Sequence, residues 1–143
     1  MEYLLIGLVI SIIYCIIILP EKSGCKPNLS FNLYPIIYDG MLIIPISDKK
    51  ALHIHHWIIA SLIILFLNKY LVTILWFFGF LAGIKVNSYI SSILSFICLI
   101  SSLIPSLTNY ISKMTLGFLI GLMIQGLTYS DAFDIIVNNP YNK

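Results

Sequence analysis

Long apolar runs, separated by short polar segments, make up most of this chain. Five of them contain no Asp, Glu, Lys or Arg: residues 3–19, 52–67, 71–84, 89–104 and 114–129. The whole sequence is 59% hydrophobic and 10% charged, whereas soluble domains are roughly 25% charged. A soluble fold of this size has too little interior to bury so much apolar surface. The sequence therefore predicts an integral membrane protein with the lipid bilayer as its partner.

The expected fold class is an all-α membrane protein of about four or five short transmembrane helices, forming a single domain over residues 1–143. The runs 71–84 and 89–104 are shorter than the ~20 residues that a perpendicular span prefers. The sequence leaves open whether these two runs cross the bilayer twice or form a re-entrant hairpin.

Two smaller elements are expected outside the apolar runs. Residues 31–46 predict a small β-hairpin in the first loop, because Asp39-Gly40 suits a type I′ turn with positive φ at both positions. The segment from Ser130 to Asp134 has the composition of a capped helix start. We expect a short amphipathic helix there, lying at the membrane interface.

The charged residues exclude one class of partner and suggest an orientation. The net charge of +2 comes from eight lysines and no arginine, and these lysines are scattered. A nucleic-acid-binding protein would show a basic stripe, so no nucleic-acid partner is expected. With five spans, Lys69 and Lys113 share one face and six lysines share the other, which the positive-inside rule makes cytoplasmic: Lys22, Lys26, Lys49, Lys50, Lys85 and Lys143. The hairpin loop, the histidines and the C-terminus are then cytoplasmic, and the N-terminus is outside.

All three histidines of the chain lie in the segment His53-Ile54-His55-His56-Trp57, where the first loop enters the second apolar run. Imidazole is a common metal ligand, and three histidines suit three corners of a zinc site. On a helix only His53 and His56 share a face, whereas in an extended chain His53 and His55 do. A metal site therefore needs a ligand from another segment.

The acidic residues after the last apolar run are candidates for that ligand. An odd number of spans brings Asp131 and Asp134 back to the face that holds the histidines. We expect Asp131 to join His53, His55 and His56 around a divalent metal, with zinc favoured. Asp131 or Asp134 is also the candidate catalytic base.

The last apolar run carries a pattern for close helix packing. Gly117, Gly121 and Gln125 recur at four-residue spacing, and small residues at this spacing let two helices approach closely. If this face meets the run 52–67, the acidic tail approaches the histidines. The Gly117/Gly121 face is equally a candidate for homo-oligomer formation.

At His53–Trp57 and again from Gly117 through Gln125 and Gly126 to Asp131, the sequence resembles small, largely uncharacterised membrane proteins of bacteria, archaea and large DNA viruses. Those proteins share a His-x-His-His helix entrance and a Gly-rich last helix that ends in an acidic residue. The resemblance implies that the two segments belong together, and it implies no particular reaction.

Three functional classes are compatible with these features. The first is a membrane protein with an interfacial His/Asp metal site that acts on a lipid-like substrate. The second is a non-catalytic structural or assembly protein whose histidines form an interfacial belt. The third is an ion conduit, which needs polar residues along a pore. The polar residues that the apolar runs offer for this are chiefly Gln125, Ser91, Ser92 and Ser95.

Overall fold

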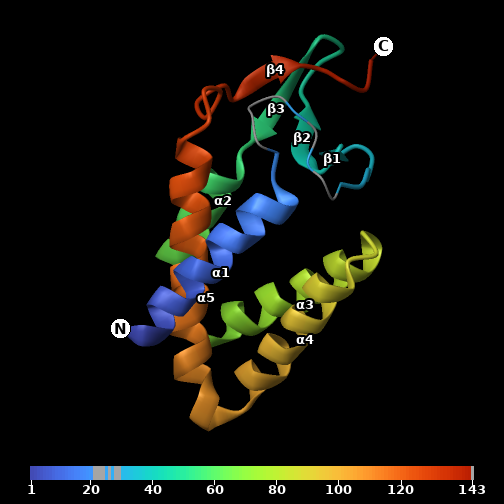
Figure 1. Ribbon diagram of the computed structural model, residues 1–143. Helices are drawn as coiled ribbons and strands as arrows, with labels where there is room; N and C mark the ends of the chain where they lie inside the picture. The colour runs from blue at the N-terminus through green and yellow to red at the C-terminus, as the bar shows by residue number, and fades with distance from the viewer. Residues whose placement is uncertain (21–24, 26, 28–29, 143) are drawn as a thin grey trace.

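The computed structural model describes residues 1–20, 25, 27 and 30–142. A bundle of helices carries a small antiparallel sheet at one end (Figure 1). The helices in the described residues are α1 (Glu2–Ile18), α2 (His56–Leu65), α3 (Lys69–Lys85), α4 (Tyr89–Leu103) and α5 (Pro105–Leu127). The strands there are β1 (Ile37–Tyr38), β2 (Met41–Pro45), β3 (Lys50–Ile54) and β4 (Ile136–Asn138).

Helix α5 is the central element of the bundle, and it packs against each of the other four helices. It begins at Pro105, nine residues before the predicted start at residue 114. Proline suits the first helical position because its fixed φ matches the helix. The polar first turns are then held by hydroxyls that donate to carbonyls one turn back, such as Ser112 to Thr108 at 2.8 Å. The prediction was wrong here because it followed hydropathy alone.

Gly117 and Gly121 of α5 contact α1, and not the 52–67 segment as predicted, whereas Gln125, the third residue of that predicted face, does contact the segment through His56. A Cβ on Gly117 would lie 2.0 Å from the carbonyl oxygen of Leu4, and one on Gly121 would lie 1.7 Å from Oγ of Ser11. From the other side, a Cβ on Gly7 would lie 1.9 Å from the Met114 carbonyl oxygen. The two helices are therefore in backbone contact. The Gly117/Gly121 face, which was the candidate for homo-oligomer formation, is covered by α1 within the chain.

Helices α3 and α4 occupy nearly the ranges expected for them and pack against each other. The Asn68 side chain caps α3 by accepting from two backbone N–H groups. At the centre of the pair, Trp76 packs with Val72 and Cys98. Its indole N–H donates to Thr115 Oγ1 of α5 at 2.9 Å. This bond ties the pair to the central helix.

The helix predicted over residues 52–67 was wrong at its start, because residues up to Ile54 belong to β3. Strand β3 pairs with β2 on one side and with β4 on the other, so its backbone groups are satisfied on both edges. Helix α2 keeps 10 residues, which span about 15 Å at ~1.5 Å per residue. That length is about half of a ~30 Å hydrocarbon core.

The sheet joins the first loop to the C-terminal tail, in the order β1-β2-β3-β4. Asp39 and Gly40, between β1 and β2, have φ of 48° and 78°, the positive values that the expected type I′ turn requires. The short amphipathic helix expected after Tyr129 is absent: residues 128–133 form turns and bends, and Ile136–Asn138 form β4. Pairing with the open edge of β3 offers this segment interstrand hydrogen bonds that an isolated short helix would lack.

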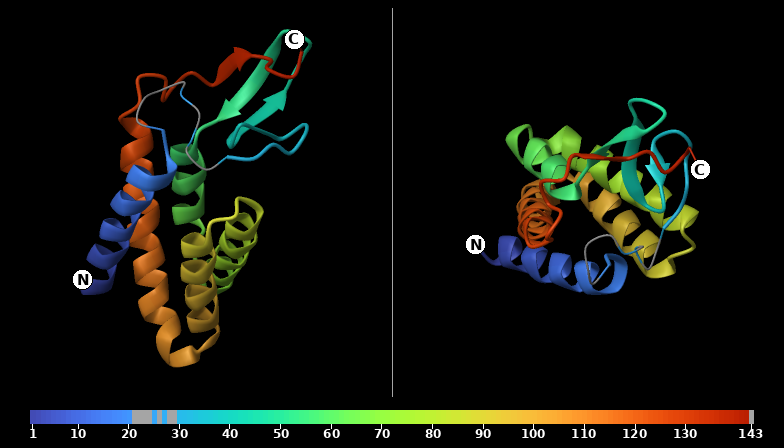
Figure 2. Two further views of the ribbon diagram at one scale, coloured as in Figure 1. Left: turned by 45° about the vertical axis from the view of Figure 1, so that its right-hand side comes forward. Right: turned by 90° about the horizontal axis from the view of Figure 1, so that it is seen from above.

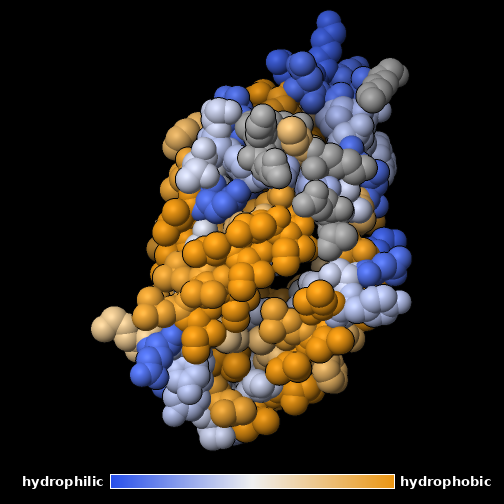
Figure 3. Space-filling view, in the orientation of Figure 1, coloured by the Kyte–Doolittle hydropathy of each residue, from blue (hydrophilic) through white to orange (hydrophobic). Residues whose placement is uncertain are grey.

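The outer surface of the helices is strongly apolar. Leu65 is 75% exposed, Phe66 70%, Ile16 73% and Ile90 79%. Figure 3 shows hydrophobic side chains over most of the bundle, with hydrophilic ones chiefly at the sheet end and a smaller hydrophilic group at the lower left of the view. Within the described residues, α5 is the one helix that is long and apolar enough, by length and composition, to cross a membrane.

The chain runs up and down the bundle, so its connections alternate between two ends (Figures 1 and 2). The sheet and the α3–α4 connection are at one end, and the α2–α3 and α4–α5 connections are at the other. Lys49, Lys50 and Lys85 accordingly lie toward the sheet end and Lys69 toward the opposite end, whereas Lys113 lies within α5 and not in a connection between helices. Lys22, Lys26 and Lys143, which also entered the orientation prediction, lie outside the described residues.

Candidate functional site

Two places in the structure gather polar groups against apolar surroundings. The first, which we term the histidine junction, consists of His53–Trp57, Gln125 and residues 129–134. The second is an apolar cavity among the helices. Neither place is made by a single element, so each depends on the tertiary fold.

At the histidine junction the chain remains extended until it enters α2. His55 has φ −67° and ψ 146° and is the N-cap of the helix. His53 and His55 therefore project on the same side of the extended chain, and their rings lie 4.0 Å apart between centroids, tilted by 39°. His56 is the first residue of α2 and points elsewhere. Of the two geometries considered from the sequence, the structure has the extended one.

His56 connects α2 to α5. Its Nε2–H donates to the side-chain oxygen of Gln125 at 2.8 Å, since an amide oxygen can only accept. The His56 ring also contacts the Tyr129 ring edge-on, with centroids 6.1 Å apart, and the Tyr129 hydroxyl donates to the Pro20 carbonyl at 2.5 Å. Gly126 admits the close approach of α2, because a Cβ there would lie 2.7 Å from Cβ of Trp57. His56 and Tyr129 thus connect α2 and α5 to the segment that follows α1.

The acidic tail meets the histidines through its backbone. The indole N–H of Trp57 donates to the Ala132 carbonyl at 2.8 Å, and Nε2 of His55 donates to the Asp134 carbonyl at 3.3 Å. His55 is 4% exposed, so this bond compensates for its burial. The Asp134 carboxylate is exposed and the Asp131 side chain is half-buried. Tail and histidines are therefore adjacent, but the tail contributes carbonyl groups to these bonds.

The electrostatics of the junction favour neutral imidazole. Burial lowers the pKa of His53, and the rings of His55 and His56 lower it further, while the Asp131 carboxylate acts in the opposite direction. Neutral imidazole is the form that binds metals. Across the described part of the chain, however, no group of three or more His, Cys, Asp and Glu side chains is arranged to hold a metal ion.

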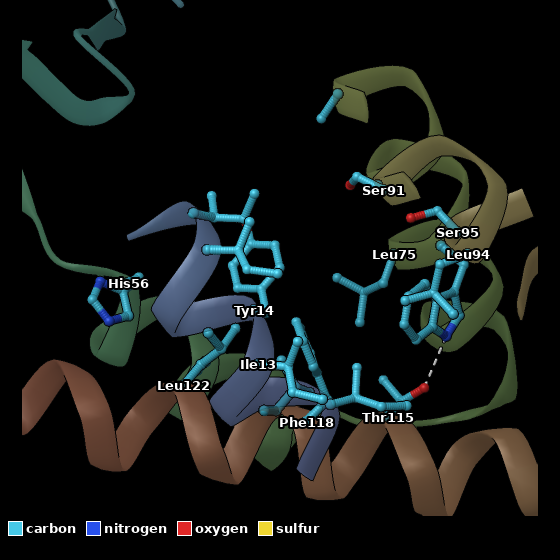
Figure 4. Close-up of a pocket in the computed structure, with 18 of the residues that line it drawn as sticks. Ile13, Tyr14, His56, Leu75, Ser91, Leu94, Ser95, Thr115, Phe118 and Leu122 are labelled. Atoms are coloured by element: carbon cyan, nitrogen blue, oxygen red, sulfur yellow. Dashed lines mark hydrogen bonds between the residues drawn. The ribbon is translucent and has the colours of Figure 1, made fainter. Parts of the chain in front are cut away.

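The cavity among the helices has a volume of about 480 Å³ and is lined by residues of all five helices. Ligand pockets typically measure ~300–1,000 Å³. The lining is dominated by aliphatic and aromatic side chains, including Ile13, Leu75, Phe118 and Leu122 (Figure 4). Figure 3 shows the surface hollowed between α1 and the α3–α4 pair.

A few polar groups interrupt this apolar lining: Tyr14, His56, Ser88, Ser91, Ser95 and Thr115. Figure 4 shows the Ser91 and Ser95 hydroxyls directed from α4 toward the space between α4 and α1. Tyr14 lies on the α1 side of that space. The cavity therefore has a small polar region on otherwise apolar walls, which is the usual composition of a small-molecule site.

A second, smaller cavity of about 150 Å³ adjoins the first. The two share Tyr14, Ile18, Ala82 and Ser91 as lining residues. The smaller one continues toward the sheet, where Gly40 of the β1–β2 turn helps to line it. The two cavities are therefore neighbours, the larger among the helices and the smaller beside the β1–β2 turn.

The sequence did not predict this cavity as a ligand site. Ser91 and Ser95 were noted only as polar residues that a conduit would require. Their four-residue spacing places them on one face of α4, which was an available signal. The residues next to Ser91 and Ser95 in the sequence do not indicate that α1 lies across the cavity from them.

Comparison with protein-family models, with curated proteins and with solved structures finds no match for this chain.

Proposed function

We propose that this chain is a small integral membrane protein that binds the hydrocarbon chain of a lipid-like molecule in the cavity among its helices. The observation that carries the proposal is the 480 Å³ apolar cavity lined from all five helices. An apolar cavity of this kind is unfavourable for water, which needs two to four polar partners. Left empty, it would forfeit the dispersion contacts of its lining.

The surface supports a bilayer as the source of that ligand. Large apolar side chains are exposed around the bundle, and extended exposed apolar surface is typical of a membrane or protein contact. The hydrophilic side chains visible in Figure 3 lie chiefly at the sheet end. We place this end, with the histidine junction and the C-terminal tail, at the cytoplasmic interface and the N-terminus outside, because Lys49, Lys50 and Lys85 lie toward it.

The histidine junction supports a structural role beside this binding function. Its ring and indole N–H groups hold α2 against α5 and hold the tail against the sheet end. Each such bond removes the cost of a buried polar group without a partner. On this proposal the junction is not catalytic and fixes the sheet over the cavity.

The test is chain binding by the purified full-length protein, read as displacement of a fluorescent polyene fatty acid by unlabelled single-chain lipids. Ala82→Phe is the informative variant, because Ala82 lines both cavities and is itself exposed. Leu81→Phe is its matched control, since Leu81 is the neighbouring residue, is 44% exposed and lines neither cavity.

We expect wild type and Leu81→Phe to bind the probe, and Ala82→Phe to bind it at least tenfold more weakly. Equal binding by all three proteins would contradict the cavity as the binding site. Membrane integration is tested separately, by resistance of the expressed protein to extraction with alkaline carbonate.

Binding of a divalent metal by His53 and His55 is a second candidate function. It is favoured by the close approach of the two rings, 4.0 Å between centroids, and by the field of Asp131 at His53. Zinc would then need Asp131 or water to complete its four ligands. Elemental analysis tests this candidate: zinc that copurifies with wild type and is lost from His53→Ala/His55→Ala supports it, and a wild type without metal refutes it.

A further inference from the structure

Three hydroxyl groups of the cavity have no hydrogen-bond partner within the described residues: those of Tyr14, Ser91 and Ser95. Two other polar lining groups are already engaged within the protein: Thr115 accepts from Trp76 at 2.9 Å, and His56 is bonded to Gln125. The contrast along α4 is clear. Ser92, which does not line the larger cavity, donates to the Ser88 carbonyl at 2.9 Å.

Ser95 is the most informative of the three. It is 5% exposed, and Figure 4 shows its hydroxyl directed into the cavity. A helical serine can usually bond to the carbonyl one turn back, and Ser95 does not do so. The Ser95 hydroxyl therefore faces the cavity without a protein partner. A ligand group in the cavity can form a hydrogen bond with it, because a hydroxyl both donates and accepts.

Resting on the proposed function, we infer that the ligand is an uncharged single-chain amphiphile whose hydroxyl-bearing head lies against Ser91, Ser95 and Tyr14. Hydroxyl side chains both donate and accept, so they are matched to a head group that also does both. No charged side chain is among the described residues that line either cavity. A charged head would therefore be buried without a counterion, which is strongly unfavourable.

The size of the cavity fits one chain. A methylene group occupies about as much space as a water molecule, ~30 Å³, so 480 Å³ accommodates on the order of 16 such groups. Two acyl chains of that length would need about twice the volume. Ser91 lines both cavities, so the head lies where they meet and the chain extends between α1, α2 and α5.

The experiment uses the fluorescence of Trp76, which lines the larger cavity, and its quenching by bromine atoms on the ligand chain. The full-length protein contains one other tryptophan, Trp57. The probes are chain-brominated hexadecan-1-ol, hexadecanoic acid and hexadecylamine, at a pH where the acid and the amine are ionised. The Trp76→Phe protein, which keeps Trp57, controls for quenching from outside the cavity.

We expect the alcohol to quench Trp76 with an affinity at least tenfold higher than that of the acid or the amine. Ser91→Ala/Ser95→Ala should reduce that preference to less than threefold, whereas Ser95→Thr, which retains a hydroxyl, should keep it. Ser101→Ala is the matched control on α4, because Ser101 lines neither cavity. The single variant Ser91→Ala should lose part of the preference if the double variant does not fold.

The outcomes separate the two proposals. Equal or tighter binding of the acid overturns this inference while chain binding stands, and loss of that binding in Lys85→Met would assign the ligand to an anionic class. Tight binding of the amine overturns the inference in the same way. Absence of quenching by all three probes contradicts both the inference and the proposed function.

Discussion

Substitution of Gly117 by alanine tests the backbone contact between α1 and α5. The added Cβ would lie 2.0 Å from the Leu4 carbonyl oxygen, whereas ordinary contacts begin near 3.4 Å. The helices must therefore separate locally by about 1.4 Å, because the clashing atom belongs to the backbone and cannot rotate away. Overpacking of this kind costs about 1–3 kcal/mol. The higher helix propensity of alanine returns at most ~1 kcal/mol.

The matched control is Gly79→Ala on α3. A Cβ there would approach only the Ser95 side chain, with Oγ at 3.1 Å. A small movement of that side chain makes room, and it offsets part of the stability that alanine gains from its higher helix propensity. We expect Gly117→Ala to lower the unfolding free energy in detergent by about 1–2 kcal/mol. Gly79→Ala should change it by less than ~0.5 kcal/mol in that direction. Thermal and denaturant unfolding followed by circular dichroism provide the measurement. If Gly117→Ala is as stable as Gly79→Ala, the close crossing is refuted.

The histidine junction yields three further predictions. Gln125→Leu should destabilise the protein by about 1–3 kcal/mol, because it leaves Nε2–H of His56 without its acceptor; a denaturant titration that shows no loss would contradict this. The pKa of His53 is lowered in the folded state from its usual 6.5, so the unfolded chain binds more protons below that pH. Stability contributed by His53 should therefore be complete above pH 6.5 and decline as the pH falls below it, and the decline should be smaller in His53→Gln. Trp57→Phe removes the donor to the Ala132 carbonyl and should speed hydrogen exchange in β4, with unchanged exchange as the contrary result.

Local chemistry predicted part of this fold. The Asp39-Gly40 turn followed from the sequence, because positive φ at two successive positions is a requirement of the turn itself. The apolar runs at 71–84 and 89–104 likewise gave nearly the ranges of α3 and α4. These features depend on a few neighbouring residues, so they can be predicted from a short stretch of the sequence.

Features that depend on distant partners were predicted less well. Residues 52–54 were assigned to a helix because their strand conformation depends on pairing with β2 and, at Leu52, with β4, which lies more than eighty positions later in the chain. Gly117 and Gly121 were assigned to the correct kind of contact with the wrong helix. A face of small residues indicates that some helix approaches closely, but it does not identify that helix.

The candidate sites divide in the same way. Topology predicted that the histidines and the acidic tail lie on one face, and in the structure they are adjacent. The sequence did not predict which atoms make the contact. Asp134 contributes its backbone carbonyl to His55, and every residue type has such a carbonyl, so a pattern of residue types does not indicate it. The cavity was missed altogether, since it is defined by five helices at once.

The pairing of Leu52 in β3 with Ile136 in β4 also sets an order of events during synthesis. A ribosome that adds ~5–20 residues per second needs several seconds to make the intervening chain. For that interval β3 has a partner on only one edge, and an open strand edge can pair with other chains. During that time, binding of the unfinished chain by a chaperone would limit pairing between neighbouring copies.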